Sequence, residues 1–182
     1  MKPQDQPNEA QTEAVQDEPK VRFLTLSLAE EHYAVEALRV REIIGILDIT
    51  PLPKMPPHVR GVVNLRGRII PIVDLRMRLG MPEVEYTART CVVVLELSGK
   101  GEEDDHVLMG AIVDLVNDVR EIGASTIAPP SVLKTSERAG FVTGLAKLEE
   151  EGLVVSLLDI DALLDPSQLS GREADAIPSE VA

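Results

Sequence analysis

The side chains that could carry out chemistry are few and widely spaced in this sequence. The single cysteine, Cys91, precedes a run of valines, which predicts a buried small side chain rather than a nucleophile. The histidines at positions 32, 58 and 106 have no spacing that would let them share a metal ion. The acidic run at 102–105 lacks the alternating aspartates of a calcium loop. These patterns do not favour an enzyme or a metal protein.

Two aspartates, Asp74 and Asp159, could be considered as a catalytic carboxylate pair. Each of them follows an apolar segment and precedes a short stretch that suits a helix. An aspartate at that position caps the free N–H groups of a helix start, which explains both residues. An enzyme or metal protein that uses Asp74 or the acidic run remains the competing class of function.

One segment runs against the overall charge of the chain. Residues 54–78 are basic, although the whole chain has 31 acidic and 18 basic residues and a net charge of -13. Asp74 is the only acidic residue in this segment. Its basic residues are Lys54, Arg60, Arg66, Arg68, Arg76 and Arg78. Because arginine makes planar bidentate hydrogen bonds with carboxylates, the segment is either solubilising charge or a docking site for an acidic partner.

The composition argues against several classes of partner and location. Aromatic residues make up 2% of the 182 residues, and tryptophan is absent. Nucleic-acid binding depends on basic surfaces and aromatic stacking, so we expect no nucleic acid partner. No apolar run approaches the ~20 residues that span a membrane, and the first residues lack the apolar stretch of a signal peptide. With one cysteine, which cannot form an internal disulfide, we expect a cytoplasmic protein without direct membrane insertion.

The elements that must position these residues are mostly strands. Both chain ends are acidic and poor in large apolar residues, which predicts disordered tails at 1–19 and 166–182 and a folded part at 20–165. We expect a helical turn at 37–43, a strand near 43–47, and short helices after Asp74 and Asp159. Apolar alternation predicts further strands at 22–28, 32–36, 59–65, 68–73, 91–97, 107–113, 142–148 and 153–158.

The folded part contains an internal repeat. The tetrapeptide Val-Arg-Glu-Ile at 40–43 recurs at 119–122. Gly61 and Gly144 each begin a predicted hairpin that leads to Asp74 and Asp159, respectively. This repeat predicts two similar halves, 20–85 and 86–165, each a small β-barrel that shares an interface with the other.

Several segments resemble the CheW family of chemotaxis coupling proteins. The strongest match is Val-Arg-Gly-Val-Val-Asn-Leu-Arg-Gly-Arg-Ile-Ile-Pro-Ile-Val-Asp-Leu-Arg at 59–76. Phe-Leu-Thr-Leu at 23–26 and Val-Arg-Glu-Ile-Ile-Gly at 40–45 look like the opening of the family domain. Further matches lie at 33–35, 110–114, 119–122 and 140–145, so the resemblance covers about 22–165.

The resemblance implies a mainly β fold of two SH3-like five-stranded β-barrel subdomains packed together, with short helices. It implies an adaptor without enzymatic activity or cofactor. Such an adaptor couples transmembrane chemoreceptors (methyl-accepting chemotaxis proteins) to the histidine kinase CheA in signalling arrays at the inner face of the membrane. The implied partners are the CheA regulatory domain, the cytoplasmic tip of the receptors and further copies in rings. The alternative is a coupling protein of a non-flagellar chemosensory pathway.

The resemblance also implies which residues bind these partners. Arg66 would anchor a polar or acidic feature of the receptor tip, and Gly61 would allow close backbone approach. The implied receptor-binding residues are Val40, Glu42, Gly61, Asn64 and Arg66. The implied kinase-binding residues are Ile127, Val132 and Leu133. The loop 98–106 is longer and more acidic than is usual in the family.

Overall fold

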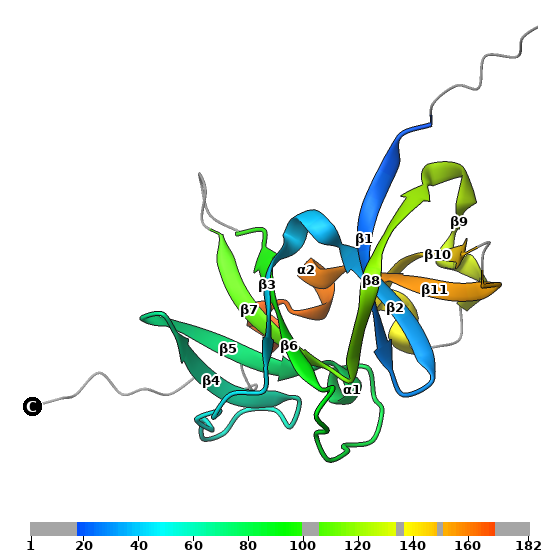
Figure 1. Ribbon diagram of the computed structural model, residues 1–182. Helices are drawn as coiled ribbons and strands as arrows, with labels where there is room; N and C mark the ends of the chain where they lie inside the picture. The colour runs from blue at the N-terminus through cyan, green and yellow to red at the C-terminus, as the bar shows by residue number, and fades with distance from the viewer. Residues whose placement is uncertain (1–17, 100–105, 134–136, 149–150, 170–182) are drawn as a thin grey trace, which may run out of the picture.

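Two β-sheets and several short helices make up the fold (Figure 1). The computed structural model describes residues 18–99, 106–133, 137–148 and 151–169. One sheet has five strands in the order β3 (Val40–Gly45), β6 (Cys91–Leu97), β7 (Val107–Val113), β5 (Arg68–Asp74) and β4 (Val59–Leu65). The other has six, in the order β8 (Leu115–Gly123), β1 (Lys20–Leu28), β2 (Glu31–Glu36), β11 (Leu153–Leu158), β10 (Val142–Leu148) and β9 (Ile127–Ala128).

The helices are single turns that follow or link strands. They are η1 (Ala37–Arg39), α1 (Leu75–Arg78), η2 (Ala124–Thr126), η3 (Pro130–Leu133), η4 (Glu137–Phe141), α2 (Ile160–Leu163) and α3 (Pro166–Leu169). None of them is long and apolar enough to cross a membrane, within the part of the chain that the structure describes.

The strands predicted from apolar alternation are confirmed, with three differences, one of which is the short strand β9, which was not predicted. The strand expected near 43–47 begins earlier, as β3 at Val40, because the helical turn before it is limited to η1. The edge strand β8 was not predicted, because its centre is the charged and exposed run Asn-Asp-Val-Arg-Glu. Charged side chains on an edge strand keep it from pairing with other chains, and they hide its alternation.

The predicted tails are described only where they meet the fold. Residues 1–17 and 170–182 lie outside the described residues. Next to β1, the Glu18 carboxylate accepts hydrogen bonds from the backbone N–H and the hydroxyl of Ser125. At the other end, the expected C-terminal tail begins with the helix α3, where Asp165 accepts a hydrogen bond from the N–H of Ser167 at 2.9 Å. The first contact joins residues 107 positions apart and the second is local, and composition reveals neither of them.

The two sheets have the same topology. The β3 strand corresponds to β8, the hairpin β6–β7 to β1–β2, and the hairpin β4–β5 to β10–β11. Each sheet also has one parallel contact at the same place, between β5 and β7 or between β11 and β2. The predicted boundary at 85/86 therefore separates two sequence repeats but does not separate the sheets. The hairpin β1–β2 of the first repeat joins the sheet of the second, and β6–β7 of the second joins the sheet of the first.

The expected barrels differ from the sheets in two ways. The sheet that contains β1 has six strands rather than five, because β9 extends it. Among the described residues, backbone pairing joins the first and last strands of neither sheet. In the five-stranded sheet, Thr50 forms an isolated antiparallel bridge with Val62 of β4. The mainly β fold of two packed subdomains is confirmed.

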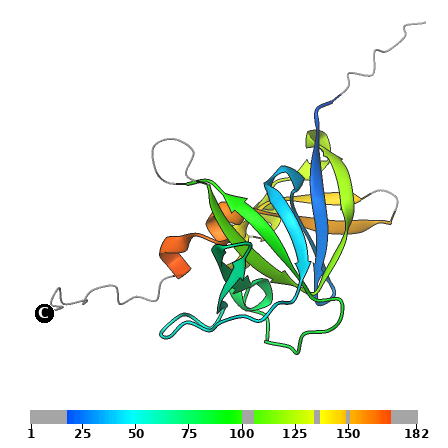
Figure 2. The same cartoon turned by 60° about the vertical axis from the view of Figure 1, so that its left-hand side comes forward.

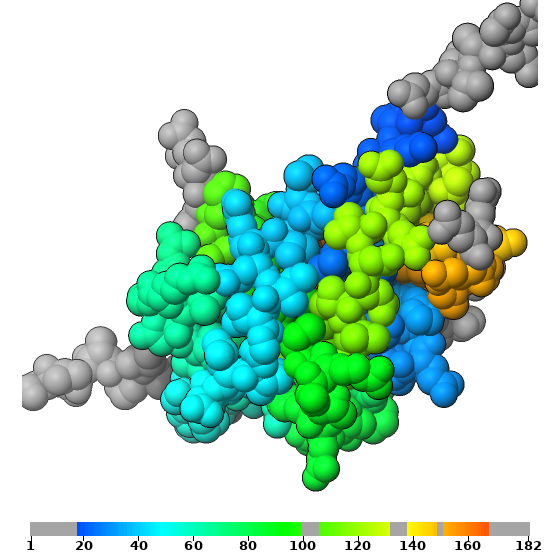
Figure 3. Space-filling model, viewed as in Figure 1, coloured from blue at the N-terminus to red at the C-terminus, as the bar shows by residue number. Residues whose placement is uncertain are grey.

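Three apolar clusters hold the sheets in place. Each sheet curls around a small cluster of its own, centred on Ile72 in one and on Leu157 in the other. The largest cluster lies between the sheets and includes Leu26, Leu95 and Leu163, each at most 1% exposed. The helices α2 and α3 lie beside β6 and β7 (Figure 2), and the space-filling view shows the two sheets packed into one body (Figure 3). Neither sheet therefore buries its apolar surface without the other.

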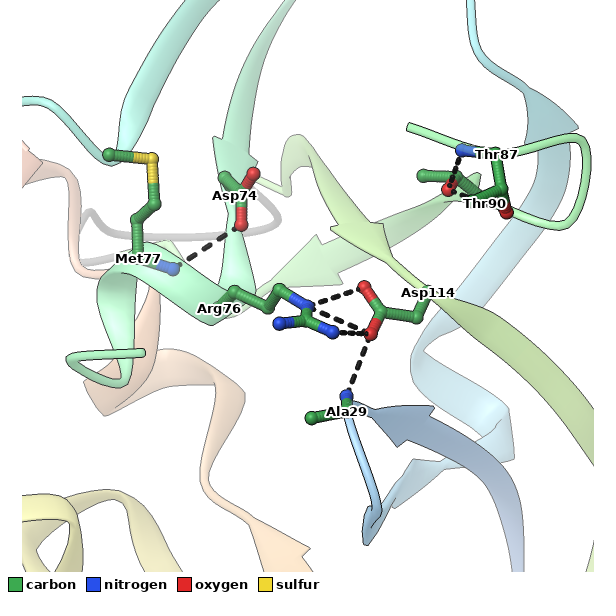
Figure 4. Close-up of polar contacts among 7 residues, drawn as sticks. All are labelled: Ala29, Asp74, Arg76, Met77, Thr87, Thr90 and Asp114. Carbon is green, nitrogen blue, oxygen red and sulfur yellow. Dashed lines mark hydrogen bonds and ion pairs between the residues drawn. The ribbon is translucent and has the colours of Figure 1, made fainter. Parts of the chain in front are cut away.

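Both predicted helix caps are present. The Oδ1 atom of Asp159 accepts a hydrogen bond from the N–H of Ala162 at 3.0 Å. The Oδ1 atom of Asp74 accepts one from the N–H of Met77 at 3.3 Å (Figure 4). Asp74 is 3% exposed and also accepts the hydroxyl of Tyr86 at Oδ2, 3.2 Å away. Burial, reinforced by the Asp74 carboxylate, raises the pKa of Tyr86 to about 12. The first cap therefore also fastens the segment before β6.

We expect Asp74→Ala to lower the free energy of unfolding by about 2–4 kcal/mol, because it removes a cap and leaves the Tyr86 hydroxyl without its buried acceptor. The matched control Asp159→Ala removes the equivalent cap alone and costs about 1 kcal/mol. Urea unfolding followed by circular dichroism measures both losses. Equal losses at the two positions would contradict the contribution of Tyr86.

A pH dependence follows from His58. Burial, and then the nearby charge of Arg78, lowers the pKa of His58, whose Nε2 atom is buried without a hydrogen-bond partner. The unfolded chain therefore takes up this proton at a higher pH than the folded chain does. We expect the free energy of unfolding to fall as pH drops below about 6.5. Unfolding at pH 7.5 and at successively lower pH values measures the slope, and His58→Gln should reduce it. An unchanged slope in the variant would rule out His58 as its source.

Candidate functional site

The structure brings together Glu42 and Arg66, two of the residues implied in receptor binding. The Nη1 and Nη2 atoms of Arg66 donate to Oε1 and Oε2 of Glu42, both at 3.1 Å. This is a bidentate pair between strand β3 and the tip of the hairpin β4–β5. The Glu42 side chain is 25% exposed and that of Arg66 is 79% exposed. A partner that approaches the tip therefore meets the cation, with the carboxylate beneath it.

The tip that carries Arg66 is a two-residue turn. Arg66 has φ +51° and Gly67 has φ +84°, the two positive values that suit a tight hairpin. The Oδ1 atom of Asn64 accepts a hydrogen bond from the N–H of Gly67 at 2.9 Å. Asn64 thus stabilises the turn from which the guanidinium projects.

The fold itself requires a glycine at position 61. Its φ is +137°, and a Cβ at this position would lie 2.1 Å from the carbonyl oxygen of Thr50. The backbones of Thr50 and Val62 exchange two hydrogen bonds of 2.9 Å at this point. The close approach that the sequence indicated is therefore made by the chain's own backbone. The receptor-binding role implied for Gly61 stays a prediction.

Val40 lies mostly beneath the surface. It is half-buried and packs against the cluster between the sheets. The register of β3 against β6 shifts between Val40 and Glu42, so Val40 and Ile43 lie on one face of the sheet and Glu42 on the other; Ile43 is 45% exposed. Ile69, next to the hairpin tip, is 64% exposed. These two apolar side chains were missed as surface residues, although the alternation around Glu42 was a usable signal for Ile43.

The basic segment 54–78 is not one free positive surface. Arg60 pairs with Glu83 at 2.7 Å, Arg66 with Glu42, and Arg76 with Asp114. The Nε atom of Arg78 donates to the carbonyl oxygen of Leu163 at 2.7 Å, and its guanidinium lies 4.6 Å from the ring centre of Phe141. Four of the six cations thus fasten parts of the chain, while Lys54 and Arg68 are exposed.

The residues implied in kinase binding lie on the other sheet. Ile127 belongs to β9, pairs with Ala146 and packs against the cluster of the six-stranded sheet. Val132 and Leu133 lie in η3, which follows β9. The β9 strand is an edge of its sheet, and it lies across the molecule from the tip of β4–β5 (Figure 1). The two implied binding regions are therefore separate.

The candidates for catalysis or metal binding do not converge. Cys91 is half-buried, and burial raises the pKa of its thiol. Across the described ranges, His, Cys, Asp and Glu side chains form no group of three or more that could hold a metal ion. Asp74 and Asp159 cap separate helices. The acidic run 102–105 lies outside the described residues.

Comparison with known proteins identifies the family of this chain. A family model for the CheW-like domain matches residues 22–168. The chemotaxis protein CheW of Klebsiella aerogenes is 34% identical over 148 residues, which cover 81% of this chain and 84% of that protein. The chemotaxis protein CheW of Rhizobium meliloti is 32% identical over 147 residues, or 80% of this chain and 88% of that protein.

A solved structure has the same fold. The crystal structure of the scaffolding protein TtCheW from Thermoanaerobacter tengcongensis matches with a TM-score of 0.68 and 30% identity. The match covers 78% of this chain and 90% of that one. Because the family model spans nearly all of the described fold and the relatives match over most of their length, the chain belongs to the CheW family of chemotaxis scaffold proteins.

Proposed function

We propose that this chain is a non-enzymatic adaptor that couples transmembrane chemoreceptors to the histidine kinase CheA in signalling arrays. The observation that carries the proposal is the bidentate Glu42–Arg66 pair, which holds an exposed guanidinium at a rigid hairpin tip. Both residues stand at positions that the family resemblance ties to receptor binding. The adaptor works in the cytoplasm, at the inner face of the membrane.

Of the receptor-binding residues, one makes the contact with the receptor and the others hold it in position. Arg66 meets a carboxylate or carbonyl group of the receptor tip, because arginine presents two parallel donors to such groups. Glu42 orients the guanidinium from below, and Asn64 holds the turn. Gly61 and Val40 support the site by building the strands beneath it.

The kinase-binding region completes the adaptor. Ile127, Val132 and Leu133 contact the regulatory domain of CheA from the edge of the six-stranded sheet, and further copies join in rings. Because the two sheets share one buried cluster, they hold receptor and kinase in a fixed geometry. A conformational bias of the receptor can then change the activity of the kinase without chemistry in the adaptor.

We expect Arg66→Glu to leave the fold intact, to weaken receptor binding at least about tenfold, and to abolish kinase activation, because it removes a charge-assisted contact. The matched control is Arg68→Glu, which makes the same charge change at an exposed neighbour. The measurements are pulldowns with a receptor cytoplasmic fragment and the CheA regulatory domain, alone and together, followed by kinase assays in reconstituted receptor assemblies.

The double variant Glu42→Arg/Arg66→Glu sharpens this test. It keeps an ion pair within the chain but places the anion outside, so we expect normal stability without receptor binding. Unchanged kinase activation in Arg66→Glu would exclude the role given to Arg66.

For Gly61 we expect stability and binding to fall together. Gly61→Ala places a methyl group against the Thr50 carbonyl and should cost about 3 kcal/mol or more. In Gly67→Ala the added methyl group meets open space, so only the positive φ is penalised, at about 1 kcal/mol. Thermal melting and the receptor pulldown compare the two. A stable Gly61→Ala protein that fails to bind receptor would instead indicate that Gly61 contacts the receptor directly.

A further inference from the structure

Two ion pairs stand where the chain passes from one sheet to the other. The chain leaves the six-stranded sheet after β2, through η1, and enters the five-stranded sheet at β3. It returns between β7 and β8 through a single residue, Asp114. Each crossing carries a charged side chain, Arg39 in η1 and Asp114 itself. Because the sheets repeat each other, the two crossings are equivalent positions of the two repeats.

The first pair joins Asp114 to Arg76 (Figure 4). The Nε atom of Arg76 lies 2.8 Å from both carboxylate oxygens of Asp114. Asp114 also accepts the N–H of Ala29, at the turn of β1–β2, at 2.7 Å. Arg76 is the second residue after the cap Asp74, on α1 of the first repeat.

The second pair joins Arg39 to Asp161. The Nη2 atom of Arg39 donates to Oδ1 of Asp161 at 2.6 Å, and its Nε atom donates to the carbonyl oxygen of Glu96 at 2.7 Å. Asp161 also accepts the N–H of Ser98 at 2.9 Å. Asp161 is the second residue after the cap Asp159, on α2 of the second repeat. It therefore occupies the place that Arg76 has in the first repeat.

The two pairs have opposite polarity. In Arg39–Asp161 the cation lies at the crossing between the sheets and the anion lies on the helix. In Arg76–Asp114 the anion lies at the crossing and the cation lies on the helix. Each pair joins the crossing of one repeat to the helix of the other. Suppose that two copies paired through their first repeats, so that the hairpin β1–β2 of one copy took the place of β6–β7 beside β5 of the other. Arg39, which follows β2, would then face Arg76 on α1. If two copies paired in the same way through their second repeats, Asp114, which follows β7, would face Asp161 on α2. The four side chains are 14–42% exposed, so these like charges would meet at partly buried positions.

We propose that the inverted polarity of Arg39–Asp161 and Arg76–Asp114 is a specificity device for pairing the two halves of the chain. It favours the unlike halves of one molecule and disfavours the exchange of hairpins between like halves of two copies. The order of strands alone does not make this choice, because both sheets have the same topology. Unfavourable contacts in the wrong pairing are a general means of specificity, and hairpin exchange is a common route to dimers. The inference concerns assembly of the fold and does not depend on the adaptor role.

The test inverts one pair in the full chain. In Arg39→Asp/Asp161→Arg the ion pair within one molecule persists with exchanged charges. Between two copies, however, the new aspartate would face Arg76 and the new arginine would face Asp114, so like halves become complementary. After refolding from urea at high protein concentration, we expect the dimer fraction to rise at least severalfold above that of the unchanged protein. Size-exclusion chromatography with light scattering measures it.

A four-residue variant is the matched control. Adding Arg76→Asp and Asp114→Arg inverts the second pair as well, which restores like charges between like halves, so this protein should refold as a monomer. The independent double variant Arg76→Asp/Asp114→Arg should form dimers as the first does. Double variants that stay monomeric, or a four-residue variant that dimerises to the same extent, would overturn the proposal.

A milder variant keeps the test decisive if charge inversion prevents folding. Arg39→Gln/Asp161→Asn removes both charges and retains an acceptor for the N–H of Ser98. It removes the repulsion between like halves without adding attraction, so we expect a dimer fraction between those of the unchanged protein and the inverted pair. A dimer fraction no higher than that of the unchanged protein would contradict the proposed role of the ion pairs.

Discussion

The fold depends on one apolar cluster that belongs to both sheets. Its members come from both repeats and from α1 and α2, and residues such as Leu26 and Leu163 are almost completely removed from water. A half of this size has too little interior to be stable alone, because a small domain buries only a modest share of its surface. Sharing the cluster removes that limit. It also couples the sheets mechanically, since neither can move without exposing apolar side chains.

The candidate site uses this rigidity at the surface. A guanidinium on a flexible loop would lose conformational freedom on binding, whereas Arg66 is already held by a bidentate carboxylate and a capped turn. Surface ion pairs contribute little to stability, about 0–1 kcal/mol. The Glu42–Arg66 pair therefore matters more for orientation than for the fold. The implied kinase-binding region at β9 is kept at a constant relation to it by the shared cluster.

Local patterns predicted most of the elements, and long-range contacts account for what was missed. Alternation located the strands, and Asp74 and Asp159 indicated their helices, because both signals lie within a few residues. The exchange of hairpins leaves no such mark, since Thr25 of β1 bonds Asp118 of β8 across 93 positions. At the site, the turn that presents Arg66 was readable. Its pairing with Glu42 and the contact of Gly61 with Thr50 join separate segments of the chain, which local patterns do not reveal.

The exchanged hairpins have a consequence for synthesis of the chain. The hairpin β1–β2 leaves the ribosome first, but its neighbour β8 is made only after the whole five-stranded sheet has been encoded. At 5–20 residues per second, the 93 positions between Thr25 and Asp118 correspond to a delay of roughly 5–19 s. During that interval the first hairpin has no permanent neighbour, and its apolar face is open to chaperones or to neighbouring nascent chains on the same message. Translation speed thus becomes a factor in how much of this protein matures.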